Sequence, residues 1–206
     1  VTPRQSTLFG GYYVGSKQWA EPYEIELRSL TERLNSCSCP DFSMNGLGTC
    51  KHIERVIQWL RDAVKPHSFE AEIRAGSPFY ELFLDNTDLD PVVRLCRPSK
   101  GNAKLDRMLR GYFDAEGRLI GDVAVVLPRL REAVTGLSSR LAAKVRLSRQ
   151  LDDYTERVLA RRRHDLYGES LNRRLDSGST TLNVVQHALY PYQHEGVKHL
   201  VLTGRA

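Results

Sequence analysis

The sequence predicts an α+β protein, and three observations lead to this prediction. Residues 23–28 alternate apolar and polar side chains, as a half-buried strand does. Residues 37–52 hold a compact Cys/His motif. Residues 128–175 repeat apolar side chains at three- and four-residue steps, as a helix does. We therefore expect a small ββα unit, a mixed α/β segment and a long helical segment, in that order.

Two strands, a loop and a helix are predicted for the first unit. Residues 31–39 can form a hairpin with the strand at 23–28. Pro40 and the glycines that follow it mark a loop. Apolar side chains over residues 53–64 recur at helical spacing, and Pro66 stops this helix because proline disrupts a helix interior.

The Cys/His motif reads Cys-x-Cys, ten spacers, then Cys-x-His, and its members are Cys37, Cys39, Cys50 and His52. Residues two apart in an extended segment point to the same side, so the first two cysteines can bind one ion together. Thiolates and an imidazole are the ligands of a closed, tetrahedral zinc site, which holds no water for catalysis. The alternative is a chance cluster of reduced thiols or a disulfide, with Cys96 as the remaining cysteine.

The spacing and the ββα order resemble the SWIM zinc finger over roughly residues 20–64. The resemblance implies that the four motif residues are ligands of a structural Zn²⁺. A structural zinc argues for a binding module and against a metalloenzyme.

Aromatic side chains precede the motif. Phe9, Tyr12, Tyr13 and Trp19 either pack against the small finger, which has little core of its own, or stack on bases beside Arg4 and Lys17. We favour the packing interpretation.

The middle segment, residues 67–126, is expected to mix strands and helices. Residues 79–84 and 91–96 look like short strands, residues 102–113 like a helix, and residues 123–127 like a buried strand or a helix start. An acidic cluster between them holds Asp85, Asp88 and Asp90. It lacks the glycine and the closing glutamate of a calcium loop, so we interpret it as a solvated turn. Cys96 is expected to be a core thiol.

Residues 128–175 should form one long helix or an antiparallel pair, because neither glycine nor proline interrupts residues 137–167. The segment is basic. Its candidate phosphate contacts are Arg146, Arg149, Arg161, Arg162 and Arg163. The alternative is a solvated helix surface with acidic partners on the same helix.

A second motif lies at residues 189–197, Leu-Tyr-Pro-Tyr-Gln-His-Glu-Gly-Val. It is similar to the signature that opens the ATPase of Swi/Snf-type helicase-like translocases, and the resemblance implies that Gln193 recognises adenine in the intact ATPase. The alternative is a generic helix with a Pro-Tyr start. The sequence contains no Gly-x-x-x-x-Gly-Lys-Ser/Thr loop and no acidic magnesium motif after it, so ATP and Mg²⁺ are expected only in an intact parent protein.

Composition favours a nucleic-acid partner. The net charge is +5, and most of the cations are arginines, which suit bidentate phosphate contacts. No apolar run is long enough for a membrane span, and no signal peptide opens the chain. Cysteines in a metal pattern suggest a reducing compartment, so we expect a cytoplasmic protein, nucleoid-associated if bacterial.

These inferences give five predicted parts. Residues 1–66 would be a SWIM zinc finger, 67–126 the mixed α/β segment, 127–175 the helical segment, 176–185 a linker and 186–206 the truncated start of an ATPase lobe. The chain would be a zinc-binding, DNA-binding accessory or regulatory region of a Swi/Snf-family DNA-dependent ATPase. One alternative is a zinc-stabilised module that recruits a protein or regulates the ATPase. Another is a nuclease, for which we find no acidic triad.

Overall fold

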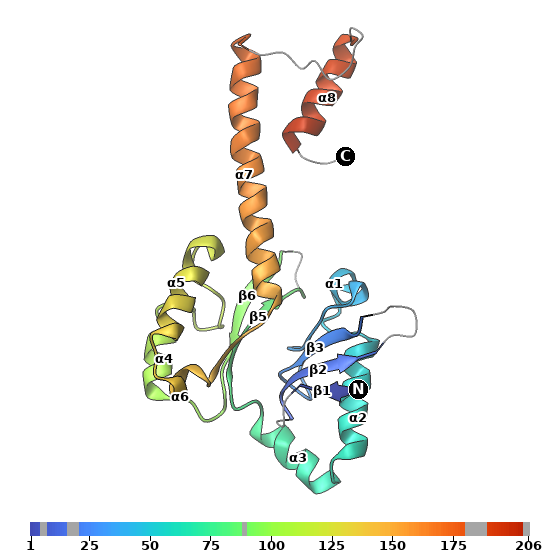
Figure 1. Cartoon of the computed structure of the whole chain (residues 1–206), viewed down its shortest axis with the longest axis vertical. Helices are drawn as coiled ribbons and strands as arrows, with labels where there is room; N and C mark the ends of the chain where they lie inside the picture. Colours follow the sequence, from blue (N-terminus) through green and yellow to red (C-terminus); the bar gives the residue numbers. More distant parts are fainter. Residues whose placement is uncertain (5–7, 16–20, 88–89, 180–188, 204–206) are drawn as a thin grey trace. The chain divides into compact units, whose positions relative to one another are not determined.

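The computed structural model describes residues 1–4, 8–15, 21–87, 90–179 and 189–203. The chain divides into two compact units, Val1–Asp152 and Asp153–Ala206. The described residues form eight helices and two small sheets, which confirms the α+β class (Figure 1). The division into five parts with boundaries near residues 66, 126, 175 and 185 stays a prediction.

The first sheet has four strands in the order β1-β2-β3-β4, and all neighbours are antiparallel. The strands are β1 (Thr2–Pro3), β2 (Gly10–Val14), β3 (Tyr23–Leu27) and β4 (Ser36–Cys37). The predicted strand and its hairpin partner are both confirmed, although the partner is only two residues long. Its register sets Cys37 opposite Ile25, and this places the first motif cysteine at the end of the sheet.

Three helices follow this sheet: α1 (Pro40–Asn45), α2 (Lys51–Ala63) and α3 (Pro66–Ala75). The helix predicted for residues 53–64 is confirmed as α2. The loop predicted from Pro40 onward is wrong in part, because Pro40 occupies the first turn of α1, where proline is tolerated, and Gly46 ends this helix at φ 62°. Helix α3 was not predicted from the sequence. Pro66 ends one helix and also begins the next.

A single apolar core joins the sheet to α2. Its members include Tyr12, Ile25, Leu27, Ile53, Val56 and Leu60, with the three motif cysteines at one edge. Tyr12 belongs to this core, so the packing interpretation is confirmed for Tyr12. Phe9 is also buried, Tyr13 is half-buried beneath the Arg4 guanidinium, and Lys17 and Trp19 lie outside the described residues.

The second sheet has the order β6-β5-β7. The two strands predicted near residues 79–84 and 91–96 are confirmed as β5 (Tyr80–Asp85) and β6 (Val92–Cys96), and the structure pairs them antiparallel. Strand β7 (Val145–Leu147) is parallel to β5 and lies where we expected continuous helix. That expectation is wrong because Val145 is buried beside Tyr80 in the sheet, and tertiary pairing outweighs a local helical pattern.

Helices α4 (Ala103–Leu109), α5 (Val123–Thr135) and α6 (Ser139–Ala142) complete the first unit. Helix α4 is shorter than predicted, because Phe113 leaves the helix and forms a bridge with Leu119. The apolar run at residues 123–127 is the start of α5, which Asp122 caps by accepting a hydrogen bond from the Ala124 N–H.

Helix α7 (Gln150–Asp176) begins in the first unit and continues into the second, where α8 (Pro191–Thr203) follows. The two helices pack closely: a Cβ atom added at Gly168 would lie 3.4 Å from the Leu202 carbonyl oxygen. Among the described residues, no helix combines the length and hydropathy that a membrane span requires.

Candidate metal centre

The four motif residues meet at one place although they come from three elements. Cys37 ends β4, Cys39 is the N-cap of α1, Cys50 is the N-cap of α2, and His52 lies in the first turn of α2. Their ligand atoms all lie within 4.8 Å of one another. The cluster is buried, with His52 as its most exposed member.

The distances fit a single ion. The Nδ1 atom of His52 lies 3.9 Å from the Sγ atoms of both Cys37 and Cys50. Ligands that bind zinc tetrahedrally at about 2.3 Å for sulfur and about 2.0 Å for nitrogen are roughly 3.6–3.8 Å apart. The cluster is therefore close enough to hold a metal ion such as zinc.

The three thiols of the cluster influence one another's pKa. The hydrogen bond with Cys37 lowers the pKa of Cys50 to about 5. The same hydrogen bond, together with burial, raises the pKa of Cys37, and burial raises the pKa of Cys39. Three neighbouring buried thiolates need a compensating positive charge, which a divalent ion with thiolate ligands supplies.

Groups around the cluster hold the ligands in place. The Phe42 N–H donates to the Cys39 Sγ atom at 3.4 Å, and the Tyr23 ring lies 4.5 Å from the His52 ring. The Gln150 side-chain amide donates to the Cys37 carbonyl oxygen at 3.2 Å. Sequence analysis missed Gln150 because it lies 113 residues away from its partner and no local pattern marks it.

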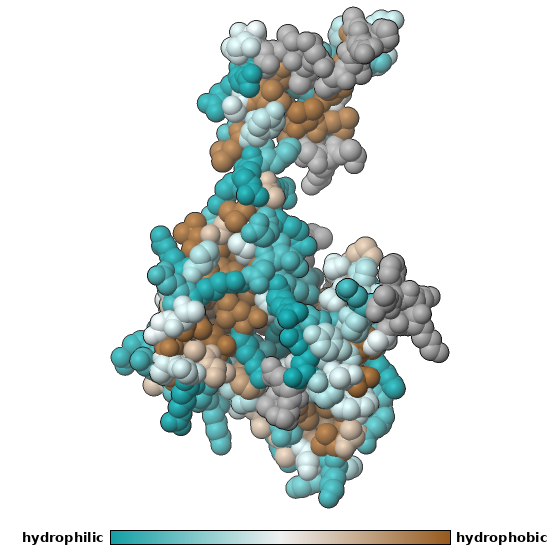
Figure 2. Space-filling view, in the orientation of Figure 1, coloured by the Kyte–Doolittle hydropathy of each residue, from teal (hydrophilic) through white to brown (hydrophobic). Residues whose placement is uncertain are grey.

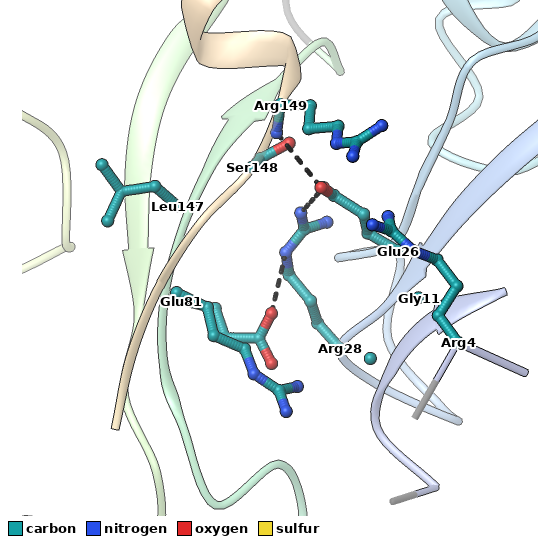
Figure 3. Close-up of a pocket in the computed structure, with 10 residues that line it drawn as sticks. Arg4, Gly11, Glu26, Arg28, Glu81, Leu147, Ser148 and Arg149 are labelled. Atoms are coloured by element: carbon teal, nitrogen blue, oxygen red, sulfur yellow. Dashed lines mark hydrogen bonds and ion pairs between the residues drawn. The ribbon is translucent and has the colours of Figure 1, made fainter. Parts of the chain in front are cut away.

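A polar cavity of about 230 Å³ lies between the two sheets of the first unit (Figure 3). It is lined by four arginines, Arg4, Arg28, Arg146 and Arg149, and by the carboxylates of Glu26 and Glu81. Arg28 donates hydrogen bonds to the Leu34 carbonyl oxygen and the Ser36 hydroxyl, and forms ion pairs with both glutamates. The cavity therefore belongs to an ion-pair network that joins the sheets.

Two of the predicted phosphate contacts take part in this network. Arg146 donates to the Phe9 carbonyl oxygen at 3.0 Å and its guanidinium lies 3.2 Å from the centre of the Phe79 ring, while burial lowers its pKa. The Arg149 guanidinium donates to Glu24 at 2.8 Å, and its backbone N–H donates to Glu26. Both side chains are thus bound within the first unit.

The remaining three predicted contacts lie elsewhere. Arg161, Arg162 and Arg163 are exposed on α7 in the second unit. The five arginines therefore belong to two different units, and their contact with nucleic acid stays a prediction.

Gln193 lies in the first turn of α8, where its Oε1 atom accepts a hydrogen bond from the Tyr190 N–H at 3.0 Å. This is the reciprocal half of a capping box, in which the third helical residue bonds back to the N-cap. The rings of Tyr190 and Tyr192 stack beside it, 5.9 Å apart. The capping hydrogen bond is a sufficient reason for a glutamine at this position, even if no nucleotide binds. The contact between Gln193 and adenine stays a prediction.

In the acidic cluster, the Asp85 carboxylate is already hydrogen-bonded to other residues of the chain. Asp85 accepts hydrogen bonds from Thr87 and from the Arg94 guanidinium, 2.8 Å away. Burial opposes the charge of Asp85, but these bonds outweigh burial and lower its pKa. Asp88 lies outside the described residues. Over the described ranges, the Cys₃His cluster is the one group of three or more Cys, His, Asp or Glu residues with metal-binding geometry.

Cys96 is half-buried on β6 and separate from the metal cluster. Burial raises the pKa of its thiol, so it stays protonated and unreactive at neutral pH. The expected core thiol is therefore partly exposed.

Comparison of the chain with protein-family models, with curated proteins and with solved structures finds no match. The interpretation of function therefore depends on the chemistry of the residues themselves.

Proposed function

We propose that this chain is a zinc-binding, DNA-binding accessory region of a Swi/Snf-family ATPase, with a SWIM-type finger at its N-terminal end. The observation that carries the proposal is the buried set of three thiols and one imidazole within 4.8 Å. Sulfur and nitrogen donors in a closed set of four are the preferred ligands of structural zinc, whereas calcium and magnesium require oxygen.

A structural role for the ion fits the small size of this part of the fold. The core formed by the first sheet and α2 is small, and a core of that size buries too little apolar area for full stability. The ion links β4, α1 and α2 at their ends, so it replaces part of the missing core.

Charge supports the choice of DNA as partner. The net charge of +5 and the exposed arginines 161–163 favour contact with phosphates, independent of base sequence. The ATPase parent is supported by the resemblance of residues 189–197 to the Swi/Snf signature, which includes Gln193. A cytoplasmic, nucleoid-associated location would follow from DNA binding and from an ATPase parent.

A protein partner is the second candidate, and one observation favours it. Met44, on α1, and Leu47, just after it, are 79% and 56% exposed. Exposed apolar side chains on a rigid finger suit contact with another protein, which would be recruited or would regulate the ATPase.

Metal analysis and a salt series test the proposal together. We expect one zinc ion per chain in protein purified under reducing conditions without chelator, and binding to double-stranded DNA that weakens steeply as salt rises. Zinc-loaded protein without DNA binding would leave the protein-partner candidate, since an apolar contact is insensitive to salt. Protein that folds with no metal would overturn the zinc assignment.

A further inference from the structure

A group of exposed positive charges in the first unit lies on and around α4, in the middle segment for which the sequence predicted no role. Five exposed cations occur within fourteen residues: Arg97, Lys100, Lys104, Arg107 and Arg110. We call this group the α4 basic face. In Figure 1, α4 lies on the opposite side of β5 and β6 from the first sheet, which carries the metal cluster. Hydrophilic side chains project from that side of the unit in Figure 2.

Helix geometry places three of these cations, Lys104, Arg107 and Arg110, on one side of α4, and Arg97 and Lys100 precede the helix. Leu105 and Leu109 are fully buried and fix the inner face of α4. Because successive helical residues are about 100° apart, Lys104, Arg107 and Arg110 fall on the opposite face. The Asn102 side chain caps the helix by accepting from the Lys104 and Leu105 N–H groups. A short, capped helix therefore presents the cations in a fixed row.

The single acidic residue of this helix does not neutralise the row. Asp106 turns inward and accepts a hydrogen bond from the Tyr80 hydroxyl at 2.8 Å. Across the described parts of the chain, no side chain of the α4 basic face forms a salt bridge or a hydrogen bond. Arg94 and Arg149 differ, since each is paired with a carboxylate of the same unit.

We propose that the α4 basic face is a contact surface for the phosphate backbone of double-stranded DNA. The inference rests on the proposed DNA-binding function and assigns a surface to it. Helix α4 spaces Lys104, Arg107 and Arg110 about 4.5 Å apart along its axis, and duplex DNA offers about one phosphate charge per 1.7 Å. Because the face is formed by lysines and arginines without an exposed aromatic ring, it suits phosphates rather than the stacked bases of a single strand.

The test removes three cations of the face in the full chain: Lys100→Ala, Lys104→Ala and Arg107→Ala together. The probe is a mixed-sequence DNA duplex, titrated by fluorescence anisotropy over a series of salt concentrations. Loss of three phosphate contacts should weaken binding about 100-fold at about 0.1 M salt and reduce the slope of log affinity against log salt by about 3. Zinc content and the circular dichroism spectrum should match the unchanged protein.

A matched variant controls for net charge: Arg55→Ala, Arg61→Ala and Lys65→Ala, three exposed cations on α2 and just after it. It should retain most of the affinity. Equal losses in the two triple variants would show that only net charge matters and would overturn the α4 assignment. Unchanged binding by the α4 variant would also overturn the α4 assignment. In either case the proposed function would stand as long as the parent protein binds the duplex. A zinc-loaded parent protein that binds no duplex would overturn both.

Discussion

Replacing Cys39 by serine should release the metal ion and unfold the finger. The change removes one of four ligands, while the serine hydroxyl can still accept the hydrogen bond from the Phe42 N–H at the start of α1, so the effect reports the lost ligand. Zinc binding contributes about 10–16 kcal/mol to the folding of small zinc domains, which is as large as the whole stability of a typical domain, about 5–15 kcal/mol. Metal analysis and a two-dimensional NMR spectrum of the amide groups would detect the loss of both zinc and fold.

Cys96→Ser is the matched control, because it makes the same chemical change at a half-buried thiol outside the cluster. This variant should retain the ion and the resonances of the finger. If Cys39→Ser protein instead kept one zinc ion per chain and a full spectrum, the cluster would not be a structural metal site, and the proposed zinc finger would lose its basis.

The metal cluster was predictable because its information is local. Metal binding restricts the residue types to a few, and Cys37 to His52 lie close together in the chain, from the end of a strand to the first turn of α2. The alternation at residues 23–28 and the apolar spacing of α2 each report the burial of one face, so the elements on both sides of the motif were also predictable. The α+β class follows from these patterns.

What the sequence did not reveal depends on contacts between distant residues. Strand β7 exists because β5 lies beside it, and residues 145–147 alone carry too short a pattern to distinguish a strand from the surrounding helix. The same holds for the arginines. A basic run marks positive charge, but only the fold shows that Arg146 is bound by Phe9 and Phe79, whereas no described residue pairs with the α4 basic face.

Arg28→Met should destabilise the first unit by about 3–5 kcal/mol, the usual cost of leaving a buried charge without its partner. The Arg28 and Glu81 side chains are 1% and 5% exposed, and the Nε atom of Arg28 lies 3.4 Å from the Glu81 carboxylate (Figure 3). The guanidinium also lies over the Phe83 ring. Glu26, its other partner, is 24% exposed and can be hydrated by water. Chemical denaturation at neutral pH, followed by tryptophan fluorescence, measures the loss.

The stability lost in Arg28→Met should depend on pH in a defined direction. Burial raises the pKa of Glu81, although Arg28 and Ser77 oppose the shift. The folded state therefore binds this proton more tightly than the unfolded state, where the glutamate pKa is about 4.3, and stability falls as pH rises from that value through the folded pKa. Without Arg28 the pKa of Glu81 should rise further, because one of the groups that lower it is gone. The pH range over which stability falls should therefore extend to higher pH. The stability difference between variant and parent should then be larger at neutral pH than near the unfolded-state pKa of about 4.3.

A second substitution distinguishes an unpaired charge from lost packing. In Arg28→Met/Glu81→Leu both buried charges are gone, and apolar pairs of similar volume often match or exceed a buried ion pair in stability. The double variant should therefore recover most of the stability lost in Arg28→Met. Its stability difference from the parent protein should no longer depend on the titration of Glu81. We expect a coupling energy between the two side chains of about 2–3 kcal/mol. If the double variant were as unstable as Arg28→Met at every pH, the hydrogen bonds of Arg28 to Leu34 and Ser36 would be its main contribution. The pair with Glu81 would then not be what joins the two sheets.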